Sequence, residues 1–247
     1  MIDVAFTGVQ VRPTDTAVVI DVLRATSTIG LALASGYERV LVAGGLEQAL
    51  ALRADGRVLA GELRCERPEG FDLGNSPEGM LSPRGRELVL ATTNGAPAIL
   101  GAGAVATEVY AASLLNLDAM LETLATVDGD ILLVCAGTDG SATIEDVYLA
   151  GRLSAGIDGP RTDAAHIAEA VAGAYPRPLD ALDASIGGRN LRAVGLDADI
   201  DFCAQESIIT VVPHLSDTLD GVAIVTAATS DVQTGAQEAG AAAGPES

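Results

Sequence analysis

The 247-residue sequence contains no lysine and no tryptophan, and it has only three cysteines and two histidines. Its 14 basic residues are therefore all arginine, against 34 acidic residues, and the formal net charge is −20. A chain this acidic would repel the phosphates of nucleic acids, so no nucleic-acid partner is expected. Three isolated cysteines without a Cys-x-x-Cys pair argue against a disulfide framework and against a structural zinc site.

Long apolar segments are also missing. No uncharged apolar run reaches about 18 residues, so no membrane partner is expected. The N-terminus lacks the basic start and long apolar region of a signal peptide, which makes a cytoplasmic location the expectation. The acidic, lysine-free balance is similar to that of proteins from extremely halophilic archaea, in which salt screens the self-repulsion of the surface. In such a background, we expect arginine chiefly where its planar guanidinium is useful.

Apolar strand-like runs alternate with amphipathic helix-like segments. This order predicts an α/β fold with a mainly parallel sheet covered by helices, and a ligand site at the carboxyl ends of the strands. We expect residues 1–227 to form a single catalytic unit, and a division of this unit into two subdomains near 156–160 is left open. We expect residues 228–247 to form a flexible acidic tail. The predicted strands lie near 17–22, 38–43, 57–61, 87–92, 104–108, 130–135, 207–212 and 221–226, and the predicted helices near 27–35, 46–54, 95–101, 112–126, 143–155 and 163–174.

The most informative stretch is Asp21-Val22-Leu23-Arg24-Ala25-Thr26-Ser27-Thr28, which follows an apolar run and precedes a helix-like one. We expect Thr26 or Ser27 to cap the helix, whose free N–H groups and dipole favour an anion. Arg24 adds a bidentate guanidinium suited to phosphate or sulfonate. Asp21, at the end of the strand, is placed to bind a cation. Together these groups indicate metal-assisted chemistry on a phosphate, whereas the alternative is a capped helix with a surface Asp–Arg pair.

Three more polar loops follow strand-like runs, and they are expected to meet at the same edge of the sheet. Residues 62–78 form a long connection, for which the alternatives are a functional loop and a surface Ω-loop. Residues 92–97 predict either a second anion cradle or a simple capped Asn-Gly turn. Residues 136–146 end in Glu145 and Asp146, of which we expect one to complement the helix dipole and the other to complete a cation site.

Taken together, these segments resemble the 2-phosphosulfolactate phosphatase (ComB-like) family over roughly residues 1–215. The matching pieces are the stretch from Asp21 to Thr28, Gly70-Phe71-Asp72-Leu73-Gly74-Asn75-Ser76-Pro77, Thr92-Thr93-Asn94-Gly95, and Cys135-Ala136-Gly137-Thr138 with Glu145-Asp146-Val147-Tyr148. The resemblance implies a Mg²⁺-dependent hydrolase that removes phosphate from a small anionic acid such as 2-phospho-3-sulfolactate. In methanogens that step belongs to coenzyme M biosynthesis. Where the family would have Ser-x-His-Gly, this sequence has Ser185-Ile186-Gly187-Gly188.

The residues also narrow the mechanism. No cysteine is followed six residues later by arginine, and neither histidine stands in an Arg-His-Gly sequence, so cysteine- and histidine-dependent phosphatases are excluded. Asp21 is followed two residues later by Leu23, so the aspartate pair of a haloacid-dehalogenase-type enzyme is absent. What remains is attack by a metal-activated water or by an unidentified nucleophile. Oxygen ligands without histidine or cysteine clusters suit Mg²⁺, which would neutralise the phosphoryl oxygens and orient the water.

These arguments assign a role to each candidate residue. The expected metal ligands are Asp21, Glu62, Glu145 and Asp146; the catalytic residues are Asp21, Arg24, Glu62 and Asp72, the last as general base; and the substrate-binding residues are Thr26, Ser27, Arg64, Asn75, Ser76, Asn94 and Arg189. The expected partner is a small phosphorylated acid, and a homodimer is left open. The alternative function, motivated by Gly187-Gly188, is a catalytically impaired relative that binds such an acid without turnover. An isomerase or lyase is a third candidate.

Overall fold

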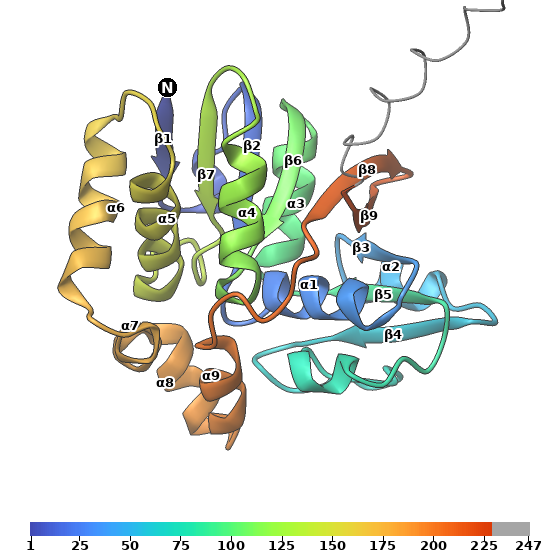
Figure 1. The fold of residues 1–247 in the computed structure, drawn as a ribbon. Coiled ribbons are helices and arrows are strands. Elements are labelled where there is room, and N and C mark those ends of the chain that lie inside the picture. The colour runs from blue at the N-terminus through green and yellow to red at the C-terminus, as the bar shows by residue number, and fades with distance from the viewer. Residues whose placement is uncertain (229–247) are drawn as a thin grey trace, which may run out of the picture.

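The computed structural model describes residues 1–228, which form a nine-stranded sheet with helices on both faces (Figure 1). The strands are β1 (Ile2–Ala5), β2 (Thr14–Ile20), β3 (Arg39–Ala43), β4 (Arg57–Gly61), β5 (Glu87–Ala91), β6 (Ala106–Ala112), β7 (Ile131–Cys135), β8 (Pro213–Leu219) and β9 (Val222–Ala227). The helices are α1 (Ala25–Ser35), α2 (Leu46–Ala51), α3 (Gly95–Gly103), α4 (Leu117–Leu124), α5 (Ile144–Gly156), α6 (Asp163–Ala174), α7 (Pro178–Ala184), α8 (Ile186–Ala193) and α9 (Asp197–Cys203).

The strand order is β1-β7-β2-β6-β8-β9-β3-β5-β4. Two parallel groups, β1-β7-β2-β6 and β3-β5-β4, are joined by the antiparallel hairpin β8–β9, which pairs with β6 on one side and β3 on the other. The predicted α/β fold with a mainly parallel, covered sheet is therefore confirmed. The antiparallel hairpin in its middle was not predicted.

Side-chain alternation along β2 shows why both faces of the sheet are covered. Val18 and Ile20 point to one face and join the core formed with α4 and α5. Ala17 and Val19 point to the other face and join the core formed with α1 and α3. Since successive strand residues face opposite sides, the apolar run at residues 17–20 of β2 has to be buried between two helical layers.

Two predictions about individual elements are wrong. Residues 207–212 do not form a strand, because the backbone N–H groups of Ser207 and Ile209 donate to the carbonyls of Leu114 and Leu115, at 2.9 and 3.0 Å, outside any sheet. The segment 112–126 is helical only from Leu117. The sequence analysis also missed β1, which has four residues, and α7–α9, each too short to show a clear helical period.

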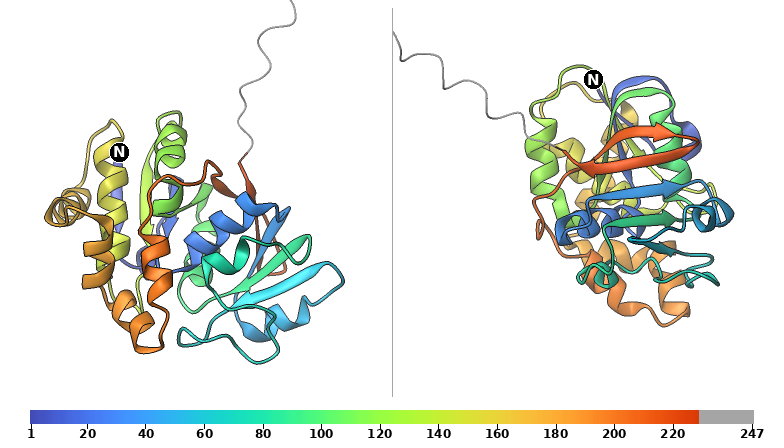
Figure 2. Two further views of the ribbon diagram at one scale, coloured as in Figure 1. Left: turned by 60° about the horizontal axis from the view of Figure 1, so that its bottom comes forward. Right: turned by 90° about the vertical axis from the view of Figure 1, so that its right-hand side faces the viewer.

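Helices α7–α9 lie together beyond the carboxyl ends of β1, β7 and β2 (Figures 1 and 2). Residues 156–160 connect α5 to α6, and these two helices pack against each other. The predicted tail falls, apart from Ala228, outside the described residues. Within residues 1–228, no helix combines the length and the apolar character needed to span a bilayer.

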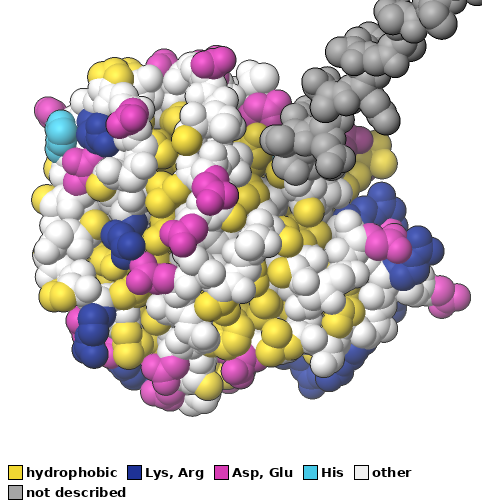
Figure 3. Space-filling view, viewed as in Figure 1, with side chains coloured by type: hydrophobic (Ala, Val, Ile, Leu, Met, Phe, Trp, Pro, Cys, Tyr) yellow, Lys and Arg dark blue, Asp and Glu magenta, His cyan; other side chains and the backbone are white. Residues whose placement is uncertain are grey.

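The arginines are unevenly distributed. Half of the 14 lie between residues 39 and 86. In Figure 3, basic side chains are visible on the side of β3 and β4, and further basic side chains lie among acidic ones on the opposite side of that face. Several of these arginines form ion pairs with neighbouring carboxylates, for example Arg57 with Glu87 and Arg86 with Glu38. Arginine is thus concentrated on the half of the molecule that carries the loop after β4, where residues 39–86 contain an equal number of acidic residues.

Candidate active site

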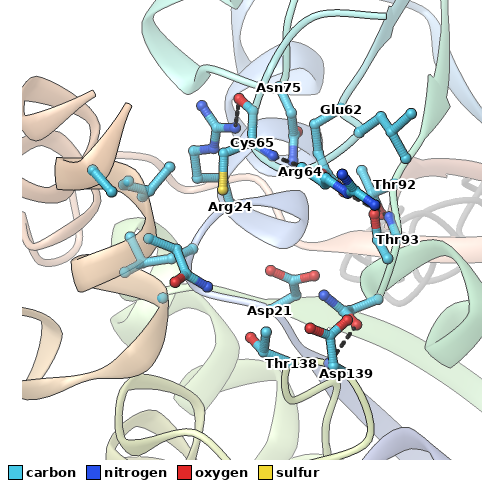
Figure 4. A pocket seen from close by; sticks show the side chains of 17 residues that line it. Asp21, Arg24, Glu62, Arg64, Cys65, Asn75, Thr92, Thr93, Thr138 and Asp139 are labelled. Atoms are coloured by element: carbon cyan, nitrogen blue, oxygen red, sulfur yellow. Dashed lines mark hydrogen bonds between the residues drawn. The ribbon is translucent and has the colours of Figure 1, made fainter. Parts of the chain in front are cut away.

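A cavity of about 600 Å³ opens where four parallel strands end (Figure 4). Asp21 follows β2, Glu62 follows β4, Asn94 follows β5 and Asp139 follows β7, and all four line the cavity. A further wall comes from α8. The prediction that the four polar loops converge at one edge of the sheet is therefore confirmed, whereas ligand binding in the cavity stays a prediction.

Asp21 occupies the N-terminal end of α1. Its Oδ1 accepts a hydrogen bond from the N–H of Ala25 at 3.1 Å, and its backbone carbonyl accepts from the N–H of Thr26 at 3.0 Å. The carboxylate itself thus fills the position at this helix terminus that was expected to attract a substrate anion. An added Cβ at Gly95 would meet Asp21 Oδ2 at 2.6 Å, so only glycine lets α3 approach so closely.

The prediction that Thr26 or Ser27 caps α1 is wrong. The residue at the N-cap is Arg24, whose side chain makes no capping hydrogen bond, and the side chain that accepts from the first N–H of the helix is that of Asp21. The Thr26 hydroxyl donates to the carbonyl of Asp21 and the Ser27 hydroxyl donates to that of Val22, both at 2.8 Å. Both side chains are completely buried and do not line the cavity. They hold the loop in shape instead of facing a ligand.

Glu145 and Asp146, in the first turn of α5, are buried behind the cavity wall and close to Asp21. Asp146 accepts hydrogen bonds from the backbone N–H groups of Val22 and Gly137, at 2.9 and 3.0 Å. Within the described chain, Glu145 Oε2 is buried without a hydrogen-bond partner. The structure does not bring either carboxylate to the cavity surface, which is where the predicted metal site requires them.

The three carboxyl groups oppose one another's ionisation. Burial, and then the charge of Asp146, raise the pKa of Asp21 to about 7. Burial, and then the charge of Glu145, raise the pKa of Asp146 to about 8. Burial also raises the pKa of Glu145 to about 7, with the charge of Asp21 acting in the same direction. The shifted pKa values favour retention of a proton by this cluster near neutral pH.

Glu62 is a link between loops. One carboxylate oxygen accepts from the N–H of Thr93 at 2.7 Å, and the other accepts from the N–H of Cys65 at 3.0 Å. The loop after β4 is thereby fastened to the loop after β5. Both oxygens have a backbone partner, so the contacts observed for Glu62 are those of a residue that shapes the cavity.

The cavity has an unusual concentration of left-handed backbone. Leu63 and Glu66 exchange two backbone hydrogen bonds at 3.0 and 3.2 Å, which closes a tight turn. Its central residues, Arg64 and Cys65, have φ values of 54° and 69°. Asp139 has φ of 51° and donates its backbone N–H to Asn94 Oδ1 at 3.2 Å. Non-glycine residues in this conformation cost free energy and cluster at functional sites.

Asp139 is a cavity carboxylate that the sequence analysis did not single out. Its setting, Gly-Thr-Asp-Gly, carries a turn signal that could have pointed to it. In Figure 4, Asp139, Thr138 and Asp21 lie across the cavity from Arg24, Cys65 and Asn75. Thr138 is another lining residue that was not assigned a role.

The three candidate arginines differ in their surroundings. Arg24 lines the cavity but is buried, and its guanidinium donates to Asp199 Oδ2 at 2.5 Å and to the carbonyl of Cys65 at 3.0 Å. Arg64 also lines the cavity, is exposed, and forms no ion pair with residues 1–228. Arg189 is not a lining residue, and it donates to the carbonyl of Ala184 at 2.6 Å. Arg64 is therefore the cavity cation whose charge is uncompensated within the described part of the molecule.

Of the remaining candidates, only Asn75 reaches the cavity, and its buried Oδ1 has no hydrogen-bond partner among the described residues. Ser76 donates to Asp199 Oδ1 at 2.6 Å. Asp72 accepts from the N–H of Leu59 at 2.8 Å, and this bond lowers its pKa. Asp72 does not line the cavity, so the structure does not place it where a general base would act.

The described chain contains no group of three or more histidine, cysteine, aspartate or glutamate side chains arranged to hold a metal ion. The predicted set of four carboxylates is thus not assembled. Mg²⁺, however, keeps several waters and needs only one or two protein carboxylates together with substrate phosphate. Asp21 fits that smaller requirement, because it lines the cavity and its Oδ2 accepts no hydrogen bond from residues 1–228.

The sequence of this chain matches a family model and several named relatives. A family model described as 2-phosphosulpholactate phosphatase matches residues 7–218. Three relatives are each named "Probable 2-phosphosulfolactate phosphatase". The one from Thermus thermophilus is 41% identical over 210 residues, covering 81% of this chain and 88% of the relative. Those from Thermotoga maritima and Deinococcus radiodurans are 38% and 39% identical, covering 87% and 81% of this chain and 95% and 88% of the relatives.

Proposed function

The chain belongs to the 2-phosphosulpholactate phosphatase family, a family of phosphoric monoester hydrolases, and on this basis we propose that it hydrolyses a small anionic phosphate monoester such as 2-phospho-3-sulfolactate. The observation that carries the proposal is the pairing of Arg64 and Asp21 in one cavity at the strand ends. Arg64 supplies an exposed positive charge, and Asp21 supplies a carboxyl group whose pKa of about 7 makes it responsive to a cation or a proton.

The substrate would be bound by groups from different loops. We assign the acid group of the substrate, a sulfonate or carboxylate, to Arg64, because a guanidinium binds such oxyanions with paired hydrogen bonds. The phosphoryl group would lie toward Thr93, Asn94 and Thr138, at the N-terminal end of α3, where backbone dipoles favour negative charge. Helix α8 forms a further wall of the same cavity.

Asp21 is the residue we propose to hold Mg²⁺. Burial and neighbouring carboxylates make an ionised Asp21 costly on its own, so a cation bound to it is favoured. When bound, Mg²⁺ supplies charge neutralisation at the phosphoryl oxygens and lowers the pKa of a bound water. Glu62 would keep the loops after β4 and β5 at the spacing that the substrate needs, through its two backbone partners.

The test is phosphate release from 2-phospho-3-sulfolactate and from phospholactate, measured with and without Mg²⁺ in low salt and in molar KCl. We expect release that depends on Mg²⁺ and is lost in Asp21→Asn. Glu122→Gln, an exposed substitution on α4, serves as the matched control and should leave the rate unchanged. Absence of release from a folded wild-type protein in every condition would refute the proposal. In that case, thermal stabilisation by sulfolactate would identify binding without turnover.

A further inference from the structure

A buried carboxylate on α9, Asp199, has no role in the site described so far. It is 3% exposed and lies 175 residues from Arg24 in the chain, yet its Oδ2 accepts from Arg24 at 2.5 Å. Its Oδ1 accepts from the hydroxyl of Ser76 at 2.6 Å. A fully buried ion pair is rare unless it is completed by further hydrogen bonds, and this one is.

The partners of Asp199 connect directly to the cavity. Arg24 lines it and also donates to the carbonyl of Cys65, the second left-handed residue of the turn that carries Arg64. Ser76 follows Asn75, whose carbonyl accepts from Thr28 on α1. Asp199 therefore fixes, through one carboxylate, the loop after β2 and the connection after β4. These two segments meet at the wall of the cavity shown in Figure 4.

The guanidinium of Arg24 is only partly engaged. It makes two hydrogen bonds with the described chain, one from each terminal nitrogen, which leaves other N–H groups of its planar fork without a partner there. Arginine orientation matters for anion binding because its donors lie in a fixed plane. Asp199 holds one terminal nitrogen of the guanidinium and the carbonyl of Cys65 holds the other, and together they set the direction in which the remaining N–H groups point.

We propose that Asp199 is a positioning residue for the phosphatase reaction, which orients Arg24 and the turn bearing Arg64 toward the anionic substrate. This inference rests on the proposed function. The competing explanation is that Asp199 merely fastens α9 to the rest of the protein. The two differ in what a folded variant does: loss of positioning lowers turnover per folded molecule, whereas loss of fastening lowers only the folded fraction.

The experiment compares Asp199→Ala with Asp199→Asn in the full chain. Alanine removes both hydrogen bonds, whereas asparagine keeps the shape and can still accept from Arg24 while its amide donates to the Ser76 hydroxyl. We expect Asp199→Ala to lower kcat by about tenfold to a hundredfold, as expected for misplacement of a binding group by about 1 Å. Asp199→Asn should recover part of this loss. Asp201→Ala, an exposed change on the same helix, is the matched control and should keep wild-type kcat.

A double-variant cycle identifies the route. If Asp199 acts through Arg24, then Asp199→Ala should add little to the loss already caused by Arg24→Lys. The concentration of folded protein is measured in parallel by circular dichroism, so that kcat refers to folded molecules. Wild-type kcat in folded Asp199→Ala, or losses that simply multiply in the double variant, would overturn the inference. An inactive wild type would instead refute the proposed function, so the two failures can be told apart.

Discussion

The buried cluster of Asp21, Glu145 and Asp146 predicts that the metal-free protein loses stability as the pH rises from 5.5 to 8.5. Their folded-state pKa values of about 7, 7 and 8 lie above the ordinary values of 3.8, 4.5 and 3.8. The folded protein therefore retains protons that the unfolded chain has already released above about pH 5. Stability is present at low pH and is lost as the pH passes through the folded-state pKa values, because the folded state binds more protons there.

The size of the effect follows from the number of protons. Each proton held by the folded but not the unfolded state lowers the free energy of unfolding by about 1.4 kcal/mol per pH unit. If the cluster as a whole holds one such proton between pH 5.5 and 7.5, the loss is about 3 kcal/mol, and it doubles to about 6 kcal/mol for two. Because the three charges interact, the slope belongs to the cluster and not to any single carboxyl.

The assay is urea unfolding followed by circular dichroism at four pH values, with a chelator present and in 1 M KCl to screen surface repulsion. Glu145→Gln should flatten the slope and converge with the parent protein near pH 5.5. A flat or rising stability in the parent, or a slope equally steep in Glu145→Gln and in the Glu122→Gln control, would refute the reasoning.

Three further outcomes are expected. Arg64→Gln should raise KM for the sulfonated substrate about tenfold to a hundredfold, since one charge-assisted hydrogen bond contributes about 1.5–3 kcal/mol. KM is measured by steady-state kinetics, and a KM equal to that of Arg189→Gln would contradict the prediction. Mg²⁺ should raise the calorimetric Tm more at pH 8 than at pH 5.5, because protons occupy the buried carboxyl groups at the lower pH. Equal Tm increases in the wild type and in Asp21→Asn would argue against a Mg²⁺ site at Asp21. Asp72→Ala should lower the free energy of unfolding by about 1 kcal/mol, because the Asp72 carboxylate accepts a backbone hydrogen bond. The variant should keep the wild-type kcat. A large fall in kcat in the folded variant would instead support Asp72 as a general base.

The convergence of the four loops could be predicted because it depends on a general property of the fold. Parallel strands end at the same edge of a sheet, so polar residues that follow several apolar runs meet there. That argument located Asp21, Glu62 and Asn94 without any knowledge of the strand order. It failed for Asp72, because the connection after β4 turns back along that strand and Asp72 bonds to the N–H of Leu59.

Contacts between distant segments could not be predicted from local patterns. The first turn of α5 marks Glu145 and Asp146 as complements of the helix dipole. The structure packs α8 against Glu145, and its Gly187 lies so close that an added Cβ would collide with Glu145 Oε1. The pairing of Arg24 with Asp199 spans 175 positions and depends on three short helices without a clear sequence signal. Arg24 was expected to bind a substrate anion or, as the alternative, to pair with Asp21 at the surface, and its buried pairing with Asp199 was not predicted.

The charge balance of the cavity links substrate binding to the uptake of a cation. Asp21, Glu62 and Asp139 line it, Arg24 is neutralised by Asp199, and Arg64 is the cation left to oppose them. A phosphate monoester that carries a second acid group would add further negative charge to this site and to a chain of net charge −20. Neutralisation of Asp21, by a proton below its pKa or by a divalent cation above it, would favour the binding of such a ligand. Affinity for an anionic substrate should therefore rise with acidity in the absence of metal and become nearly independent of pH in its presence.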